Sequence, residues 1–279
     1  MIYLDNAATT KPCDEAKAAV MKGLEVFGNP SSLHRAGLDA ELLVSDAREI
    51  IADALGVTPD EVYFTSGATE SNNTAIFGAY KAHGKRKKRV VISSVEHPAV
   101  KNPAQELEDM GCEVIRISPD ENGEINARDI FAAVNEDTFL VSCMLVNNEN
   151  GYILPVEKAF SMIKKKYPQV LTHCDCVQGF MKIPVKAKKL NADMISLSGH
   201  KIYAPKGIGA LYVKKGIHIP PFMLGGGQEK GFRSGTESVP LICGFGAAVK
   251  KLAPNVSANF EKEADIQAYL CLLYTSPSP

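Results

Sequence analysis

The sequence has no excess of charge, no long apolar run and no paired cysteine motif. Its 279 residues carry a formal net charge of -1, so we expect neither nucleic acid nor an anionic membrane surface as a partner. No apolar segment is long enough to span a bilayer, and the first residues lack the basic start and apolar core of a signal peptide. The seven cysteines are scattered, without a C-x-x-C pair. This usage is typical of a reducing cytoplasm and argues against a disulfide framework or a zinc site.

Alternation of strands and helices is the main pattern in what is present. With 45% hydrophobic and 23% charged residues, the composition is typical of a soluble globular protein with a sizeable core. Apolar runs predict strands at 62–65, 90–93, 114–117, 139–146, 170–174, 194–197 and 210–213. Helical spacing predicts helices at 15–27, 36–55, 70–83, 98–110, 127–134 and 156–166. This order predicts an α/β fold with a mostly parallel sheet that is sandwiched by helices.

A lysine, Lys201, follows closely on the apolar strand at 194–197. Desolvation at the end of a buried strand lowers the pKa of a lysine and frees its amine as a nucleophile. Ser198 and His200 place a hydroxyl and an imidazole beside the amine, which suits an anionic phosphate next to an imine. A solvated loop lysine is the plain alternative for any single lysine. Together with its neighbours, however, Lys201 is typical of a pyridoxal-phosphate lysine.

Other strand ends carry candidate binding residues, because open α/β sheets bind ligands at the carboxyl ends of their strands. The turn at 65–71 leads through small and hydroxyl residues, including Thr69, into a helix. Such a turn cradles a phosphate or is simply a helix cap. His97 lies just past a strand end, where it would cover a planar ring, move a proton or serve structure alone. Asn148 closes a long apolar strand, where turn chemistry explains it equally well.

An acidic residue, Asp175, ends another buried strand. Such a burial is costly unless the carboxylate is paired, and a protonated pyridine nitrogen would be such a partner. Keeping that nitrogen protonated is what lets the ring act as an electron sink. Three residues on, Gln178 is placed to hydrogen-bond a ring hydroxyl. Cys174 and Cys176 flank Asp175 at strand spacing, so we expect both to point away from it as small core residues.

The order and spacing of these residues resemble the cysteine desulfurases, which form part of class V of the aminotransferase-like, fold-type I pyridoxal-phosphate enzymes. The resemblance extends from residues 3–10 to a glycine-dense loop at 225–237. The forms of 198–207 and 225–229 are similar to the NifS/IscS group. The resemblance implies pyridoxal 5'-phosphate as the cofactor and a homodimer as the assembly.

It also implies a role for each candidate residue. Lys201 forms the imine with the cofactor, Asp175 pairs with the pyridine nitrogen, and Gln178 contacts the ring oxygen. His97 stacks on the ring and, with Lys201, makes up the catalytic pair. The remaining cofactor-binding positions that the resemblance implies are Ala68, Thr69, Asn148, Ser198, His200 and Thr236, the last contributed to the other subunit of the dimer.

The implied reaction converts L-cysteine to L-alanine and leaves a protein persulfide. Its sulfur would pass to acceptor proteins such as an iron–sulfur scaffold, or into thiolation. In this family a cysteine on a mobile loop and a carboxylate-binding arginine lie in a smaller C-terminal domain, and neither is expected in this sequence. The alternatives are another class V activity, such as selenocysteine lyase or an aminotransferase, or an inactive fragment that acts as a scaffold.

The domain organisation follows from the same resemblance. Residues 1–13 form an arm that belongs to the small domain, and residues 14–256 form the large cofactor-binding domain. Residues 257–270 begin a helix that leads to the small domain, which is largely missing. The tail at 271–279 resembles a translated sequencing adapter, so we expect it to be non-native and to interrupt that helix.

Overall fold

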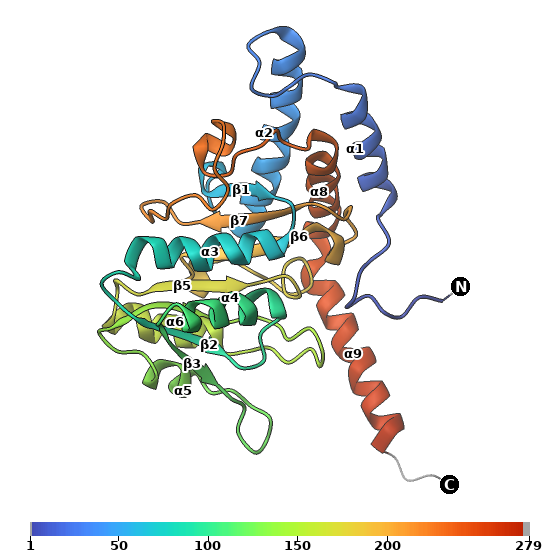
Figure 1. Cartoon of the computed structure of the whole chain (residues 1–279). Coiled ribbons are helices and arrows are strands. Elements are labelled where there is room, and N and C mark those ends of the chain that lie inside the picture. The colour runs from blue at the N-terminus through green and yellow to red at the C-terminus, as the bar shows by residue number, and fades with distance from the viewer. Residues whose placement is uncertain (1, 276–279) are drawn as a thin grey trace.

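A seven-stranded sheet with the order β1-β7-β6-β5-β4-β2-β3 forms the centre of the computed structural model, which describes residues 2–275 (Figure 1). Its strands are β1 (Val62–Thr65), β2 (Arg89–Ser93), β3 (Glu113–Ile117), β4 (Thr138–Ser142), β5 (Leu171–Asp175), β6 (Met194–Ser198) and β7 (Gly209–Val213). Strand β7 pairs antiparallel with β1 and with β6, and all the other neighbouring strands pair in parallel. The mostly parallel sheet predicted from the sequence is confirmed.

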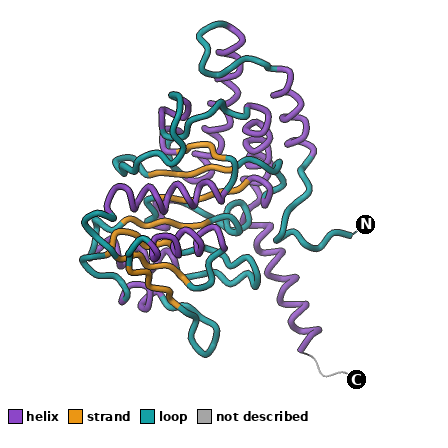
Figure 2. The backbone as a smooth tube through the Cα atoms, in the orientation of Figure 1, coloured by secondary structure: helices purple, strands orange, loops and turns teal. Residues whose placement is uncertain are grey.

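Helices cover both faces of this sheet (Figures 1 and 2). They are α1 (Asp14–Glu25), α2 (Arg35–Leu55), α3 (Ala68–His83), α4 (Pro98–Asp109), α5 (Ala127–Ala132), α6 (Val156–Lys166), α7 (Ala187–Leu190), α8 (Val239–Leu252) and α9 (Val256–Thr275). Helices α3 and α4 share one hydrophobic cluster with the sheet, and α2, α5, α6 and α8 share the cluster on the opposite face. None of the helices in residues 2–275 has the length and apolar character needed to cross a bilayer.

The apolar runs of the sequence became strands because they are buried from both sides. Strands β4, β5, β6 and β7 are buried at every position. Each strand differs from its predicted range by at most one residue at either end, except β4. That strand ends at Ser142, four residues before the predicted Val146, which instead forms an isolated bridge with Ile153. The backbone N–H groups of Cys143 and Leu145 still donate to the β5 carbonyls of His173 and Asp175, so the chain continues beside β5 after the regular strand has ended.

Two helices extend beyond what the sequence indicated. Helix α8 was not predicted; it is packed against both α1 and α2. Helix α9 begins next to the predicted start at Ser257 but continues past Leu270 to Thr275, so the expected interruption at Cys271 is wrong. No glycine or proline lies between Leu270 and Thr275 to break the helix. The rest of the tail, residues 276–279, lies outside the described residues.

Candidate active site

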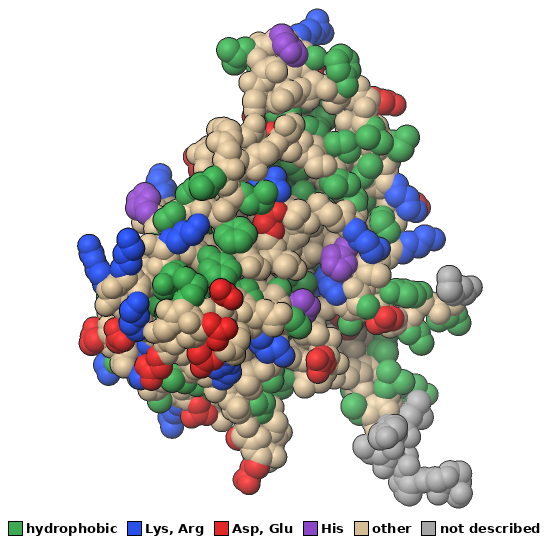
Figure 3. Space-filling model, in the orientation of Figure 1, with side chains coloured by type: hydrophobic (Ala, Val, Ile, Leu, Met, Phe, Trp, Pro, Cys, Tyr) green, Lys and Arg blue, Asp and Glu red, His purple; other side chains and the backbone are tan. Residues whose placement is uncertain are grey.

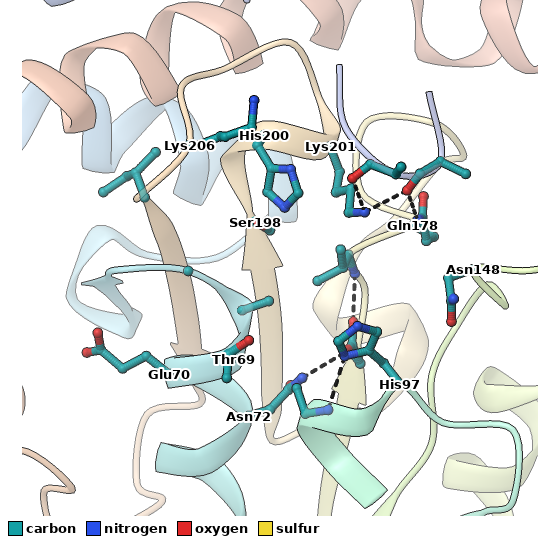
Figure 4. Close-up of a pocket in the computed structure, with 18 of the residues that line it drawn as sticks. Thr69, Glu70, Asn72, His97, Asn148, Gln178, Ser198, His200, Lys201 and Lys206 are labelled. Carbon is teal, nitrogen blue, oxygen red and sulfur yellow. Dashed lines mark hydrogen bonds between the residues drawn. The ribbon is translucent and has the colours of Figure 1, made fainter. Parts of the chain in front are cut away.

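A cavity of about 600 Å³ lies at the carboxyl ends of the parallel strands (Figure 4). It contains nine of the ten residues predicted to bind the cofactor. These are Ala68, Thr69, His97, Asn148, Asp175, Gln178, Ser198, His200 and Lys201. Thr236 does not line it, and its assignment to the site of a second subunit stays a prediction. The nine residues come from distant parts of the sequence, so the sheet topology is what brings them together.

Asp175 forms the deepest acidic group of the cavity. It ends β5, its side chain is buried, and Asn72 of α3 donates to its Oδ2 at 2.7 Å. The backbone N–H of Val177 donates to Oδ1 at 3.0 Å. Burial raises the pKa of Asp175 above its usual value, although both hydrogen bonds oppose that shift. No lysine or arginine within residues 2–275 forms an ion pair with this carboxylate, so it is suited to a cationic ligand.

The strand pleat directs the neighbours of Asp175 to the opposite face. Cys174 and Cys176 are fully buried, and their Sγ atoms are 3.4 Å apart. Both belong to the hydrophobic cluster under α5, α6 and α8, on the face opposite α3. Their predicted role as small core residues is confirmed. Burial raises the pKa of the Cys174 thiol well above its usual value, so it is a poor nucleophile.

Lys201 lies in a 3₁₀ turn, Gly199–Lys201, directly after β6. Its Nζ donates to the carbonyl oxygens of Ala7 at 2.6 Å and Ala8 at 2.7 Å. Desolvation lowers the pKa of Lys201, and the carboxylates of Asp5 and Asp175 partly oppose this. The predicted lowering of this pKa is therefore confirmed. A lysine in this state loses its proton more easily and becomes a better nucleophile.

The turn before α3 has the geometry of an anion cradle. Gly67 has a φ of 152°, a conformation that L-residues rarely adopt, and a Cβ at this position would meet no atom within 4 Å. Helix α3 begins one residue later, and Ser66 to Glu70 all line the cavity. The N-terminus of α3 therefore offers backbone N–H groups and a favourable dipole to an anion. Ser198 and His200 line the same cavity from β6 and its following turn.

Two further residues face the cavity from loops. His97 precedes α4, and its Nδ1 accepts from the backbone N–H of Ala99 at 3.1 Å. This cap fixes the ring orientation while the side chain still lines the cavity, so the structural and functional interpretations of His97 apply together. In the loop after β4, Asn147 accepts two backbone N–H groups and shapes the turn. The next residue, Asn148, lines the cavity.

Sequence reasoning missed the side chains that support these groups. Asn72 is fully buried, lines the cavity, and has an Oδ1 without a hydrogen-bond partner among the described residues. Its position one helical turn after Thr69 is a signal that could have identified it. Lys182 donates to the Oε1 of Gln178 from four residues further along the chain. Nothing in the pattern around Lys182 indicated that contact.

Two buried titratable groups, Glu96 and His173, were also not predicted from the sequence. Glu96 is 1% exposed; its Oε1 accepts from the Ser93 hydroxyl and from the backbone N–H of Met144. Burial raises the pKa of Glu96 to about 8, and the nearby charge of Asp175 adds to this. His173 lies two residues before Asp175, on the same side of β5, and desolvation lowers its pKa to about 3. Both groups are therefore neutral at pH 7.

The donor set fits pyridoxal phosphate. A buried carboxylate without a cationic partner among the described residues suits a pyridinium nitrogen, and a lysine with a lowered pKa suits an imine. The α3 N-terminus and the hydroxyl of Ser198 suit the phosphate. The unpartnered Asn72 Oδ1 shows in addition that at least one buried acceptor is left for a ligand donor.

Comparison with known proteins agrees with this geometry. The sequence model of the family described as Aminotransferase class-V matches residues 2–272. A NifS/IcsS protein homolog of Lactobacillus delbrueckii is 44% identical over 96% of this chain and 70% of its own length. A cysteine desulfurase IscS of Dictyoglomus turgidum is 42% identical over 96% of this chain and 68% of its own length. For a cysteine desulfurase IscS of Methanosarcina thermophila, the matched share of its own length is 61%.

Solved structures give the same result. A NifS-like protein superposes with a TM-score of 0.89 and 41% identity, over 92% of this chain and 71% of that one. A structure described as SspA in complex with cysteine superposes with a TM-score of 0.87 and 39% identity, over 90% of this chain and 73% of that one. The chain therefore belongs to the class-V aminotransferase family, among the NifS/IscS-type cysteine desulfurases.

Proposed function

We propose that this chain binds pyridoxal 5'-phosphate and supplies the cofactor-binding part of a cysteine desulfurase, which converts L-cysteine to L-alanine. The observation that carries the proposal is the pairing of two oppositely shifted groups in one cavity. Asp175 is a buried acid without a cationic partner among the described residues, and Lys201 has a pKa lowered by desolvation. The cofactor, when bound, supplies an electron sink that stabilises negative charge at the substrate α-carbon.

We assign the other roles in the reaction to residues of this chain. Asp175 holds a proton on the pyridine nitrogen, because a buried carboxylate is stabilised by a cation at contact distance. Lys201 provides the covalent attachment and afterwards moves the α-proton of the substrate. His97 covers one face of the cofactor ring. The hydrogen bond from the Ala99 N–H fixes the orientation of the His97 imidazole. Gln178 donates to the ring oxygen.

The phosphate is held at the other end of the cavity. We assign it to Ala68 and Thr69 at the start of α3 and to Ser198 and His200 near Lys201, joined by Thr236 of a second subunit. Asn148 lies near the ring and the substrate carboxylate. The lowered pKa of His200, caused by desolvation and then by Lys201, keeps its ring neutral near pH 7. We propose a neutral donor for this phosphate contact.

The proposed assembly and partners follow from the family. We propose a homodimer in the cytoplasm that passes persulfide sulfur to acceptor proteins such as an iron–sulfur scaffold. Cysteine as the substrate is supported by the neighbour solved in complex with cysteine. We further propose that residues 1–13 and the helix from 257 belong to a second, smaller domain. Exposed apolar side chains on the N-terminal arm and on α9, such as Leu4 and Tyr269, support that assignment (Figure 3).

The decisive experiment replaces the lysine. Lys201→Ala should abolish the borohydride-reducible adduct with pyridoxal phosphate, because no other residue is assigned the covalent role, while loose binding in the cavity remains. Lys158→Ala is the control, since Lys158 is an exposed residue of α6. Mass spectrometry of the reduced protein measures the adduct. An unchanged adduct in the Lys201 variant would overturn the proposal.

A further inference from the structure

Lys182 is a half-buried lysine beside the cavity that the function described above does not use. It lies in the segment after β5, and its ammonium donates to the Oε1 of Gln178. Lys182 is not among the residues that line the cavity. Its hydrogen-bonding effect on a bound ligand therefore passes through Gln178, while its charge also acts on Lys201 and His200.

The amide of Gln178 is held in one orientation from both ends. Its Oε1 faces the Lys182 ammonium, which only donates, and its Nε2 donates to the backbone carbonyl of Ala7 at 2.8 Å. Rotating the amide by 180° would set two donors against each other at Lys182 and two acceptors against each other at Ala7. A glutamine between two like partners would have no such preference.

The fixed orientation has a consequence for the cavity. Gln178 is 6% exposed and lines the cavity together with Asp175 and Lys201. A primary amide nitrogen has two N–H groups, and the contact with Ala7 uses one of them. The second N–H is left for a ligand acceptor, whereas a reversed amide would present only an acceptor of its own.

We propose that Lys182 is a positioning residue that keeps the Gln178 amide nitrogen directed at the ring oxygen of bound pyridoxal phosphate. This inference rests on the proposed function, because the ring oxygen belongs to that cofactor. The charged groups that act on Lys182 are Lys201 and Glu263 of α9. Desolvation, followed by Lys201, lowers the pKa of Lys182 to about 8, while Glu263 opposes the shift. The amine is therefore mostly protonated, and a pure donor, at pH 7.

The test measures binding and spectrum rather than turnover. Apo-protein is titrated with pyridoxal phosphate, and the pH midpoint of the absorption band of the bound cofactor is recorded. Lys182→Met, which keeps chain length but removes the donor, should raise the dissociation constant about tenfold and shift that midpoint. Lys182→Arg keeps a donor, so its dissociation constant and its pH midpoint should both equal the wild-type values. Lys186→Met is the matched control, because Lys186 contacts only backbone carbonyls at the end of α2 among its recorded hydrogen bonds.

A double-mutant cycle separates positioning from a direct or structural role. In a Gln178→Ala background, Lys182→Met should have no further effect on the dissociation constant. An equal, additive loss in that background, or a wild-type midpoint in Lys182→Met, overturns the proposal. If Lys182→Met does not fold, Lys182→Leu, which also lacks a donor, is used in the same cycle and should show the same dependence on Gln178. Wild-type protein that binds no pyridoxal phosphate would instead overturn the proposed function itself.

Discussion

The cavity is bounded by two regions that are built in opposite ways. We call Asp175, Glu96 and His173 the floor: only Asp175 lines the cavity itself, and all three side chains lie at or near strand ends and are almost completely buried. The arm, residues 2–13, contains no helix or strand and is mostly exposed (Figure 2), and its residues Asp5, Ala7 and Ala8 line the cavity. The floor contributes ionisable groups with shifted pKa values. The arm contributes backbone carbonyls and the exposed carboxylate of Asp5.

The arm is attached by a short series of hydrogen bonds rather than by a core. The Thr10 Oγ1 accepts from the backbone N–H of Tyr203 at 2.6 Å and donates to the His200 carbonyl at 2.9 Å. The backbone N–H of Cys13 donates to the Tyr203 carbonyl at 2.9 Å. Because these contacts follow the segment that carries Lys201, the arm places Ala7 and Ala8 against the lysine amine.

The floor and the arm are controlled by different interactions. Burial in the sheet decides the protonation states of the floor, since desolvation is the first cause of all three shifts. The arm has little buried surface, so removing single hydrogen bonds should loosen it without unfolding the protein.

The largest effect concerns Glu96 and pH. Its folded pKa, about 8, lies above its unfolded value of 4.5, so the native state retains a proton that the unfolded state has lost. Between pH 5 and pH 8 the stability therefore falls with rising pH, by about 4 kcal/mol relative to Glu96→Gln, which cannot titrate. Urea unfolding of both proteins across this range measures the difference. A constant difference would mean that Glu96 is ionised in the folded protein.

Replacing His173 should cost about 3 kcal/mol. Its Nδ1 is 2.7 Å from the Ser142 Oγ and its Nε2 is 2.9 Å from the Ser196 Oγ, so His173→Ala leaves a cavity and two unpaired hydroxyls. The folded pKa, about 3, lies below the usual 6.5, so wild-type stability should fall as pH decreases below 6.5. The variant should lose that dependence. Denaturant unfolding checks both, with the exposed His218→Ala as a control that should be neutral.

Asp175→Asn should separate attachment from chemistry. The amide keeps the volume of the side chain, so the adduct with Lys201 should still form. The pyridine nitrogen loses its anionic partner, and exchange of the α-proton of L-cysteine in D₂O should slow about a hundredfold. NMR follows this exchange. Near-normal exchange would show that the floor does not set the protonation of the ring.

Loosening the arm should have the smallest effect on stability. Thr10→Val keeps the shape of the side chain but leaves the Tyr203 N–H unpaired, so we expect a loss of about 1 kcal/mol. Amide hydrogen exchange at residues 9–11, at Cys13 and at Tyr203 should accelerate, while the strands keep their protection. Thr9→Val is the comparison, since Thr9 Oγ1 has only the 3.1 Å contact with His200 Nδ1 among its recorded side-chain hydrogen bonds. Acceleration in the strands as well would show that the arm is part of the core.

Most of the strands could be predicted because buried strands correspond to continuous apolar runs in the sequence. The end of β4 could not, since residues 143–146 are as apolar as the strand before them and only the contact with β5 and the following turn decides where pairing stops. Helix α8 was missed for a related reason: its environment on several sides comes from α1 and α2. Local patterns report burial but not the partner that causes it.

The sequence alone determined which residues near the strand ends are candidates for the chemistry. Asp175 ends an apolar strand and Gln178 and Lys201 lie three residues beyond strand ends, and a parallel sheet brings such positions to one edge. Only the tertiary structure decided how these groups are supported. Asn72 on Asp175, Lys182 on Gln178 and the arm carbonyls on Lys201 are contacts whose geometry no periodicity encodes, two of them between residues more than a hundred positions apart. Protonation states at the floor also required the structure, because desolvation depends on what surrounds a group in space rather than on its neighbours in the chain.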